Sequence, residues 1–343
     1  MDKLRLSYIS SWNVACGIAM YTKHLVDGIR RKGYDVFAYP NTTYYHDILS
    51  EVQKNDINVV NFQYEPILYP NLNGLVGLLQ RLRAYGTKVV FTLHSEHPRI
   101  IPRLAHHVDK FIYHRPPTLI GPDQARVIPM GVPSYEPEVS RKEMRARYGY
   151  AEDDIVISTV GFAFKWKTFP GVLDHMVRFI KSKPKYKVQL LISNSDINRN
   201  ETVNEILHVR QVIQKTRLQR QVWVNDGSFL PQKELSERLY LSDLGYLWSG
   251  ITTRSSSAAG KEFVTARLPF VITNSTHYHD LVPFAARVTN MTFKGFVDGV
   301  FSIVEDDTAL SIAREKIAER YQLLNYNDHV NKFIEFYEEV LSE

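Results

Sequence analysis

Cysteine is nearly absent from this chain, because Cys16 is the only one among its 343 residues. A single cysteine excludes an internal disulfide bond. Long apolar runs are also missing, and none reaches the roughly 18 residues that a transmembrane helix requires. The first residues enter a strand-like segment directly and lack the apolar stretch of a secretory signal. These absences lead us to expect an intracellular, cytoplasmic protein without a transmembrane segment.

Repeats and low-complexity tracts are missing as well, and the composition is that of an ordinary globular protein. Hydrophobic residues make up 44% of the chain and charged residues 23%, and the length suggests about two domains. The formal net charge of +5 suits anionic ligands such as nucleotide diphosphates. The same charge permits contact with nucleic acid or with an acidic membrane surface.

Short apolar, β-branched runs alternate with helical patterns in the first part of the chain. Apolar residues recur at the 3–4 spacing of amphipathic helices over residues 18–29 and 75–85. This alternation predicts a parallel sheet covered by helices. The expected strands cover residues 4–10, 34–39, 58–63, 88–93, 110–113 and 126–128.

A second alternating series follows a proline-punctuated linker at residues 129–140. Its expected elements are strands at 155–160, 188–193, 222–225, 244–248 and 270–273, with helices at 169–181, 204–216, 232–240, 261–267, 309–323 and 328–340. The fold class we predict is therefore α/β, with two Rossmann-like doubly wound domains that face each other across a cleft. Ligands of such sheets bind beyond the carboxyl ends of the strands.

The segment from Arg254 to Glu262 carries the strongest chemical signal in the sequence. Three serines, two alanines and a glycine lead from a turn into a helix, so free backbone N–H groups and hydroxyls gather at a helix N-terminus. The helix dipole adds roughly half a positive charge there, which favours a phosphate. Glu262, about two turns further on, offers a carboxylate that can hold a diol.

Polar residues at expected strand ends of the first half form a second group of candidates. Gly17 opens the helix after the first strand, and a glycine there allows a ligand close to the backbone. His94 ends the strand at 88–93 and can hydrogen-bond in either charge state. The histidine spacings do not match a zinc site, so no metal is expected.

The segment from Arg254 to Glu262, with Pro269 after it, resembles the donor-sugar motif of glycosyltransferase family 4. In that family two glutamates stand eight positions apart. Glu262 falls on the second glutamate, whereas Arg254 replaces the first. The sequence is therefore similar to a divergent member of the family.

Other segments resemble the same family in the same order along the chain. Residues 16–21 resemble its Gly-Gly-Ile-Ala-X-Tyr loop, residues 61–66 its His-X-Gln-Tyr-Glu-Pro segment, and residues 92–94 its Thr-Leu-His end. Residues 161–167 resemble its Gly-Arg-X-X-X-X-Lys run, with Phe162 in place of the arginine that helps to neutralise the donor diphosphate. Residues 226–239 resemble the segment whose backbone meets the nucleotide base.

The resemblance implies a GT-B fold and a retaining, metal-independent glycosyltransferase without a cofactor. Residues 1–135 would then bind the acceptor, 136–325 the nucleotide-sugar donor, and a closing helix at 326–343 would cross back to the first domain. The donor would be a UDP- or GDP-linked sugar. The donor-binding residues it implies are Gly161, Lys165, Lys167, Ser228, Phe229, Arg254, Ser255, Ser256, Ser257, Ala258 and Glu262.

Most of the remaining groups would come from the first domain. The resemblance gives Gly17 and His94 of that domain, together with Arg254 of the second domain, as the residues nearest the reaction. It gives Ile18, Ala19, Tyr64 and Glu65 as the acceptor-binding residues. The acceptor itself stays open between a carbohydrate, a lipid-linked glycan and a modified nucleic acid.

Several alternatives remain open at this point. Either Arg254 or Lys165 supplies the positive charge toward the diphosphate that Phe162 lacks. Alternatively, Arg254 recognises an acidic or otherwise unusual sugar. The basic charge also fits a glycosyltransferase that acts on modified bases of DNA. The two substituted donor positions fit a non-catalytic nucleotide-binding protein. A sugar epimerase on the same fold is a further alternative.

Overall fold

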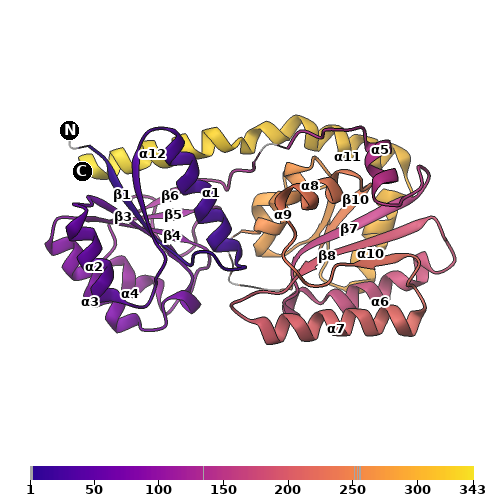
Figure 1. Cartoon of the computed structure of the whole chain (residues 1–343), viewed down its shortest axis with the longest axis horizontal. Coiled ribbons are helices and arrows are strands. Elements are labelled where there is room, and N and C mark those ends of the chain that lie inside the picture. Colours follow the sequence, from indigo (N-terminus) through magenta and orange to yellow (C-terminus); the bar gives the residue numbers. More distant parts are fainter. Residues whose placement is uncertain (1–2, 134, 251, 253, 255) are drawn as a thin grey trace. The chain divides into compact units, whose positions relative to one another are not determined.

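The chain forms two compact units in a computed structural model that describes all residues except 1, 2, 134, 251, 253 and 255 (Figure 1). Unit 1 comprises Met1–Gly131, Thr253–Ser256 and Tyr326–Glu343. Unit 2 comprises Val132–Thr252 and Ser257–Asn325. Each unit is built around its own parallel sheet, so each is described separately.

The described part of unit 1 contains one six-stranded sheet in the order β2-β1-β3-β4-β5-β6, and every neighbouring pair is parallel. β1 lies between β2 and β3, so the strand order reverses direction there. Its strands are β1 (Arg5–Ile9), β2 (Asp35–Tyr39), β3 (Val59–Tyr64), β4 (Lys88–Leu93), β5 (Lys110–Tyr113) and β6 (Ala125–Val127). The carboxyl ends of β1, β3 and β4 therefore meet at the point where doubly wound sheets bind ligands.

Helices cover both faces of the unit 1 sheet (Figure 1). They are α1 (Gly17–Arg31), α2 (Tyr45–Lys54), η1 (Pro66–Leu68), α3 (Leu72–Ala84), α4 (Ile101–Ala105) and α12 (Tyr326–Ser342). α12 packs against α1 at Gly28, where a Cβ would lie 2.6 Å from Val330 Cγ2. This close approach ties the last helix of the chain to the first.

The described part of unit 2 contains a second six-stranded sheet, in the order β12-β11-β10-β7-β8-β9 with all neighbours parallel. β7 lies between β10 and β8, and the strand order reverses there. Its strands are β7 (Ile155–Phe162), β8 (Tyr186–Ser193), β9 (Val222–Val224), β10 (Leu244–Leu247), β11 (Phe270–Thr273) and β12 (Arg287–Thr289). The expected ligand position is thus the carboxyl end of β7.

Helices also cover both faces of the unit 2 sheet (Figure 1). They are α5 (Arg141–Arg147), η2 (Lys165–Lys167), α6 (Phe169–Ile180), α7 (Arg199–Thr216), α8 (Gln232–Tyr240), α9 (Ala258–Thr265), η3 (Thr276–Leu281), α10 (Phe293–Val304), α11 (Asp307–Arg320) and η4 (Tyr321–Leu324). Among the helices of the described residues, none is long and apolar enough to cross a membrane.

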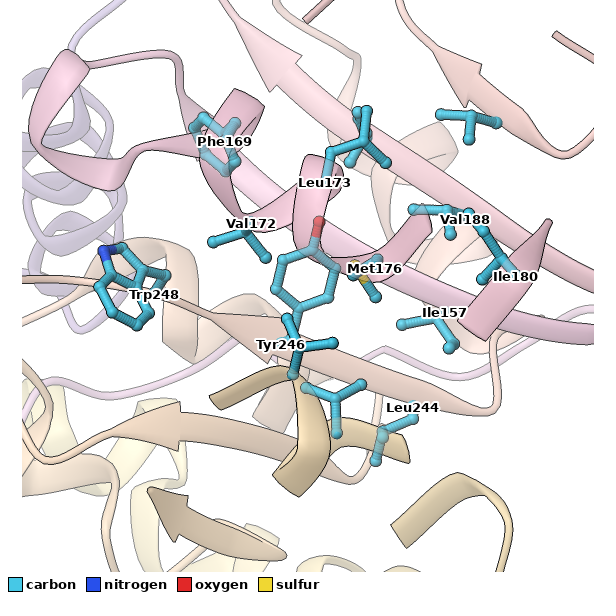
Figure 2. Close-up of a cluster of buried hydrophobic side chains, with 14 of the residues drawn as sticks. Ile157, Phe169, Val172, Leu173, Met176, Ile180, Val188, Leu244, Tyr246 and Trp248 are labelled. Carbon is cyan, nitrogen blue, oxygen red and sulfur yellow. The ribbon is translucent and has the colours of Figure 1, made fainter. Parts of the chain in front are cut away.

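A dense apolar cluster fixes β7 from one side of the sheet. Val172 and Met176 of α6 pack against Ile157, Val188 and Tyr246 (Figure 2). Each side chain of this size contributes about 1.5–3 kcal/mol when it is fully buried. A second cluster, which includes residues of α8 and α9, packs on other side chains of the same sheet. The loop after β7 and the start of α9 are therefore held by well-packed elements.

The predicted fold class is confirmed, because both halves form parallel sheets with helices on both faces. The expected strand ranges agree with β1 to β11 to within a few residues. The sequence-based prediction missed α10 (Phe293–Val304), a largely apolar helix whose polar residues Lys294, Asp298 and Ser302 form one narrow face. It also missed α2, α5 and the short edge strand β12.

Candidate functional site

Gly161 shapes the carboxyl end of β7. Its φ angle of +126° lies in a region that side chains disfavour and glycine adopts readily. A Cβ at this position would overlap the amine of Lys167 and lie 3.2 Å from the Cβ of Ala259. The backbone of Gly161, the Lys167 amine and the first turn of α9 therefore lie together.

Lys167 is buried, with 6% of its surface exposed, which is unusual for a lysine. Its Nζ lies 5.4 Å from the centre of the Trp166 ring and 5.9 Å from that of Phe169. Lys165 in the same short helix is exposed, and its backbone N–H donates to Glu201. Of the two predicted lysines, only Lys167 is therefore packed against the glycine and α9.

α9 begins beside this amine. Ser257 is its N-cap, and the serine Oγ accepts a hydrogen bond of 3.2 Å from Gly260 N. Ala258 and Ala259 form the first turn, and both are partly exposed. A helix N-terminus next to a buried ammonium is a site for a phosphate group. Ser255 lies outside the described residues.

Glu262 lies further along α9 and is partly exposed. Burial raises the pKa of Glu262 from its ordinary value of 4.5 to about 7, and a hydrogen bond from Gln232 opposes this rise. The Gln232 Nε2 atom donates to Glu262 Oε2 at 2.7 Å. Near neutral pH the carboxyl group can therefore either donate to or accept from a diol. Sequence reasoning missed Gln232, although its place in the first turn of α8 beside the expected base-contacting loop was a usable signal.

Phe162 takes part in a row of aromatic rings in unit 2. Its ring stacks on Phe229, with centroids 5.7 Å apart, and lies 6.0 Å from Phe164. Phe164 in turn stacks on Trp166 at 6.1 Å. Phe229 is 42% exposed and Ser228 beside it is exposed. Position 162 thus offers an apolar surface rather than a charge.

The first turn of α1 carries three predicted residues of unit 1. Gly17 and Ile18 are partly exposed and Ala19 is buried. Cys16, the N-cap, has an extended backbone and accepts a hydrogen bond from Ser11 at 3.7 Å. This helix start follows β1, so a second helix N-terminus lies at the carboxyl end of a central strand.

His94 lies just after β4 and contacts α1. Its ring centre is 5.7 Å from that of Tyr21 and 5.7 Å from that of His114. Burial, followed by the effects of His114 and Arg254, lowers the pKa of His94 well below its usual range. His94 is therefore neutral near pH 7 and can serve as a hydrogen-bond partner without carrying charge.

Arg254 belongs to unit 1, together with Ser256, although the sequence reading placed this segment within residues 136–325. Its backbone forms an antiparallel bridge with Ser95, next to His94. Sequence patterns do not reveal this pairing.

Tyr64 and Glu65 end β3 of unit 1. Tyr64 is buried, and its ring stacks on Tyr69 at 5.4 Å and on Phe91 at 5.2 Å. Glu65 is partly exposed, and its buried Oε2 has no hydrogen-bond partner among the described residues. Of the two, only Glu65 has an oxygen that needs a partner. Their roles toward an acceptor stay predictions.

Among the described residues, no group of three or more His, Cys, Asp or Glu side chains is arranged to hold a metal ion. The arrangement that is present consists of a buried amine and a helix N-terminus in unit 2, and a neutral histidine with a neighbouring arginine in unit 1.

Two Rossmann-like units with these strand orders define a GT-B fold. No model of a known protein family matches the chain, and no curated protein matches it. Solved structures do match: a glycosyltransferase from Rickettsia africae has a TM-score of 0.72, with 14% identity over 99% of this chain and 99% of that chain. Sucrose-phosphate synthase from Thermosynechococcus elongatus has a TM-score of 0.79, with 13% identity over 99% and 100%. Anabaena HepE in complex with UDP-glucose has a TM-score of 0.74, with 11% identity over 98% and 99%. At these identities the likeness shows the fold.

Gly161→Ala is expected to weaken the binding of UDP or GDP by about 10- to 100-fold. The added methyl group strains the backbone and displaces the Lys167 amine, and a charge-assisted hydrogen bond to phosphate contributes about 1.5–3 kcal/mol. Isothermal titration calorimetry measures the change. Gly149→Ala is the matched control, because Gly149 has a φ of +78° but no neighbour within 4 Å among the described residues. Equal affinities of the two variants for UDP or GDP would contradict a phosphate site at Gly161 and Lys167.

Proposed function

We propose that this chain is a retaining, metal-independent glycosyltransferase that moves a sugar from a UDP- or GDP-linked donor to an acceptor hydroxyl. One observation carries the proposal: the buried Lys167 amine lies against Gly161 at the first turn of α9. This arrangement suits a diphosphate, and it lies at the carboxyl end of β7 in a GT-B fold. HepE, which shares the fold, was solved with UDP-glucose.

Each unit has a separate task in this proposal. In unit 2, Lys167 and the N–H groups of α9 bind the diphosphate, and Glu262 binds the ribose hydroxyls. The backbone around Ser228 and Phe229 meets the base. In unit 1, His94 and the first turn of α1 bind hydroxyl groups of the sugar or the acceptor.

The proposed catalysis is electrostatic. The amine and the helix N-terminus stabilise the charge that develops on the leaving diphosphate, while the acceptor hydroxyl attacks an oxocarbenium-like carbon. Preorganised donors of this kind act most strongly where water is excluded. The burial of Lys167 supports this role, because its amine is held in place before the donor binds.

A panel of nucleotide sugars in a thermal-shift assay tests the proposal. A ligand at 100 times its Kd stabilises the folded protein by about 2.7 kcal/mol, so at least one UDP- or GDP-sugar is expected to raise the Tm clearly. The matching nucleoside is expected to raise it less, because it lacks the diphosphate. If no nucleotide sugar raises the Tm and none is consumed, the proposal is wrong.

Arg254→Ala is expected to leave UDP and GDP affinity unchanged and to abolish a preference for an acidic sugar. The bridge with Ser95 and the influence on His94 place this arginine with the groups proposed for sugar hydroxyls. Competition between a uronic-acid donor and its neutral counterpart measures the preference. Arg31→Ala, on the exposed end of α1, is the control. A loss of diphosphate affinity would instead favour the charge-replacement hypothesis.

A further inference from the structure

A chain of buried hydrogen bonds leads inward from His94. The Nε2 atom of His94 lies 2.9 Å from Gln63 Oε1. The other end of this amide, Gln63 Nε2, donates to Asn61 Oδ1 at 2.7 Å. Both amides lie on β3, two residues apart, so they line the same side of that strand.

The series of hydrogen bonds continues to the last helix. Asn61 Nδ2 donates to the hydroxyl of Tyr337 on α12 at 2.9 Å, and this hydroxyl lies 2.7 Å from that of Tyr8 on β1. Thr92 Oγ1 on β4 lies 2.9 Å from Asn61 Nδ2. Asn61, Thr92, Tyr8 and Tyr337 are all fully buried, as is the amide of Gln63.

The orientation of the two amides gives these hydrogen bonds a direction, because Gln63 Nε2 donates to Asn61 Oδ1. A buried polar group without a partner costs about 1–3 kcal/mol, so the burial of both amides favours keeping these bonds. Asn61 Oδ1 is an acceptor and therefore holds the Nε2 end of Gln63. The remaining end, Gln63 Oε1, can only accept, so His94 must donate through a hydrogen on its own Nε2.

The same logic decides what the other ring nitrogen of His94 does. A neutral imidazole carries a hydrogen on only one of its two nitrogens, so Nδ1 is an acceptor when Nε2 is protonated. Burial, His114 and Arg254 hold the pKa of His94 low and keep the ring neutral, and Tyr21 packs against its edge. The ring thus offers a single acceptor, which matches the hydroxyl of a sugar.

We propose that Gln63, held by Asn61 and Tyr337, is a positioning residue that fixes His94 as the Nε2-protonated tautomer and presents Nδ1 to a hydroxyl of the sugar or the acceptor. The role toward a hydroxyl rests on the proposed function, whereas the tautomer does not. Through these hydrogen bonds, the position of Tyr337 on α12 affects the orientation of the His94 ring, although α12 carries none of the residues proposed to bind substrate.

Nitrogen NMR of the full chain labelled at histidine tests the tautomer directly. The His94 signals are assigned as those that disappear in His94→Gln. The wild type is expected to show the Nε2-protonated form at neutral pH. In Gln63→Leu, which removes the acceptor, the ring is expected to become a mixture of tautomers. In Gln63→Glu, the tautomer is kept and the pKa of His94 rises, because a carboxylate accepts the same hydrogen and stabilises a charged ring.

Turnover of a nucleotide sugar provides the second readout. Gln63→Leu is expected to lower kcat by about 10- to 100-fold with little change in KM for the donor, because a buried donor left without its acceptor costs about 1–3 kcal/mol. Gln189→Leu in unit 2 is the matched control, because Gln189 is also fully buried but bonds to Ser158 and Ser242. The control is expected to lower the Tm and to leave the His94 spectrum unchanged.

Three results overturn the proposal: a wild-type His94 protonated on Nδ1, an unchanged His94 spectrum in Gln63→Leu, or an altered spectrum with an unaltered kcat. Failure of the proposed function has a different signature. In that case no nucleotide sugar is consumed by the wild type, while the tautomer still responds to Gln63→Leu.

Discussion

Lys167→Met is expected to lower kcat/KM for a nucleotide-sugar donor by about 100-fold. The lysine amine is buried beside Gly161 and the first turn of α9. In the proposed function, the charge of the leaving diphosphate develops there. Removing one preorganised donor from such a position costs about 2.7–4 kcal/mol of transition-state stabilisation. Methionine keeps most of the side-chain length and its packing on Trp166 and Phe169, so the folded structure is preserved.

Steady-state kinetics with the donor found by thermal shift measure this effect. Lys181→Met is the control, since Lys181 is an exposed lysine at the end of α6 in the same unit. It is expected to change kcat/KM by less than about twofold, because a single exposed charge contributes little. A Lys167 variant that behaves like this control would show that the diphosphate lies elsewhere.

Glu262→Gln is expected to weaken nucleoside diphosphate binding by about 10- to 100-fold at pH 8. A carboxylate that accepts hydrogen bonds from the ribose hydroxyls contributes about 1.5–3 kcal/mol for each bond. Because the pKa of Glu262 is raised to about 7, the wild-type affinity is expected to increase from pH 6 to pH 8. The glutamine variant lacks this increase.

The raised pKa of Glu262 also predicts how the stability of the protein changes with pH. A carboxyl group with a raised pKa binds its proton more tightly in the folded state, so its contribution to stability is fully present below pH 4.5 and is lost as pH rises through about 7. Glu262→Gln is expected to remove this decline from urea-unfolding curves. Glu315→Gln, an exposed carboxylate of α11, is expected to keep it. A decline that persists in the Glu262 variant would assign it to other groups.

The sequence predicted the fold class because buried parallel strands require continuous apolar, β-branched runs. Segments such as β4 and β7 carry that pattern, and each ends in the residues that the strand order then brings to one edge of a sheet. Gly161 and Lys167 came from the family resemblance, and their roles stay predictions. Their spacing is local, and the packing between them follows from the turn that joins β7 to α6.

Contacts between segments that are distant in the sequence could not be predicted from it. Arg254 joins unit 1 through a bridge to Ser95, and no periodic pattern indicates that pairing. The hydrogen bond from Asn61 to Tyr337 likewise joins the third strand to the last helix. Such contacts depend on how the elements pack, whereas the sequence pattern reports only which face of each element is apolar.

The neighbours of Phe162 show what replaces the arginine that the family motif has at this position. The sequence showed a missing arginine, and the structure shows a ring stacked on Phe229. An apolar pair at this place leaves Lys167 as the buried cation beside Gly161 among the described residues. In the proposed function, one lysine and the start of α9 bind the phosphates that two charged side chains bind in the family that the sequence resembles.

Release of a nucleoside diphosphate from UDP- and GDP-linked sugars tests the central claim most directly. We predict that the wild-type chain releases UDP or GDP from at least one donor without added metal, and that Lys167→Met loses nearly all of this activity while the Lys181→Met control keeps it. If the wild type neither binds nor cleaves any nucleotide sugar, or if Lys167→Met cleaves the donor as fast as the wild type, the site described in unit 2 is not a donor site.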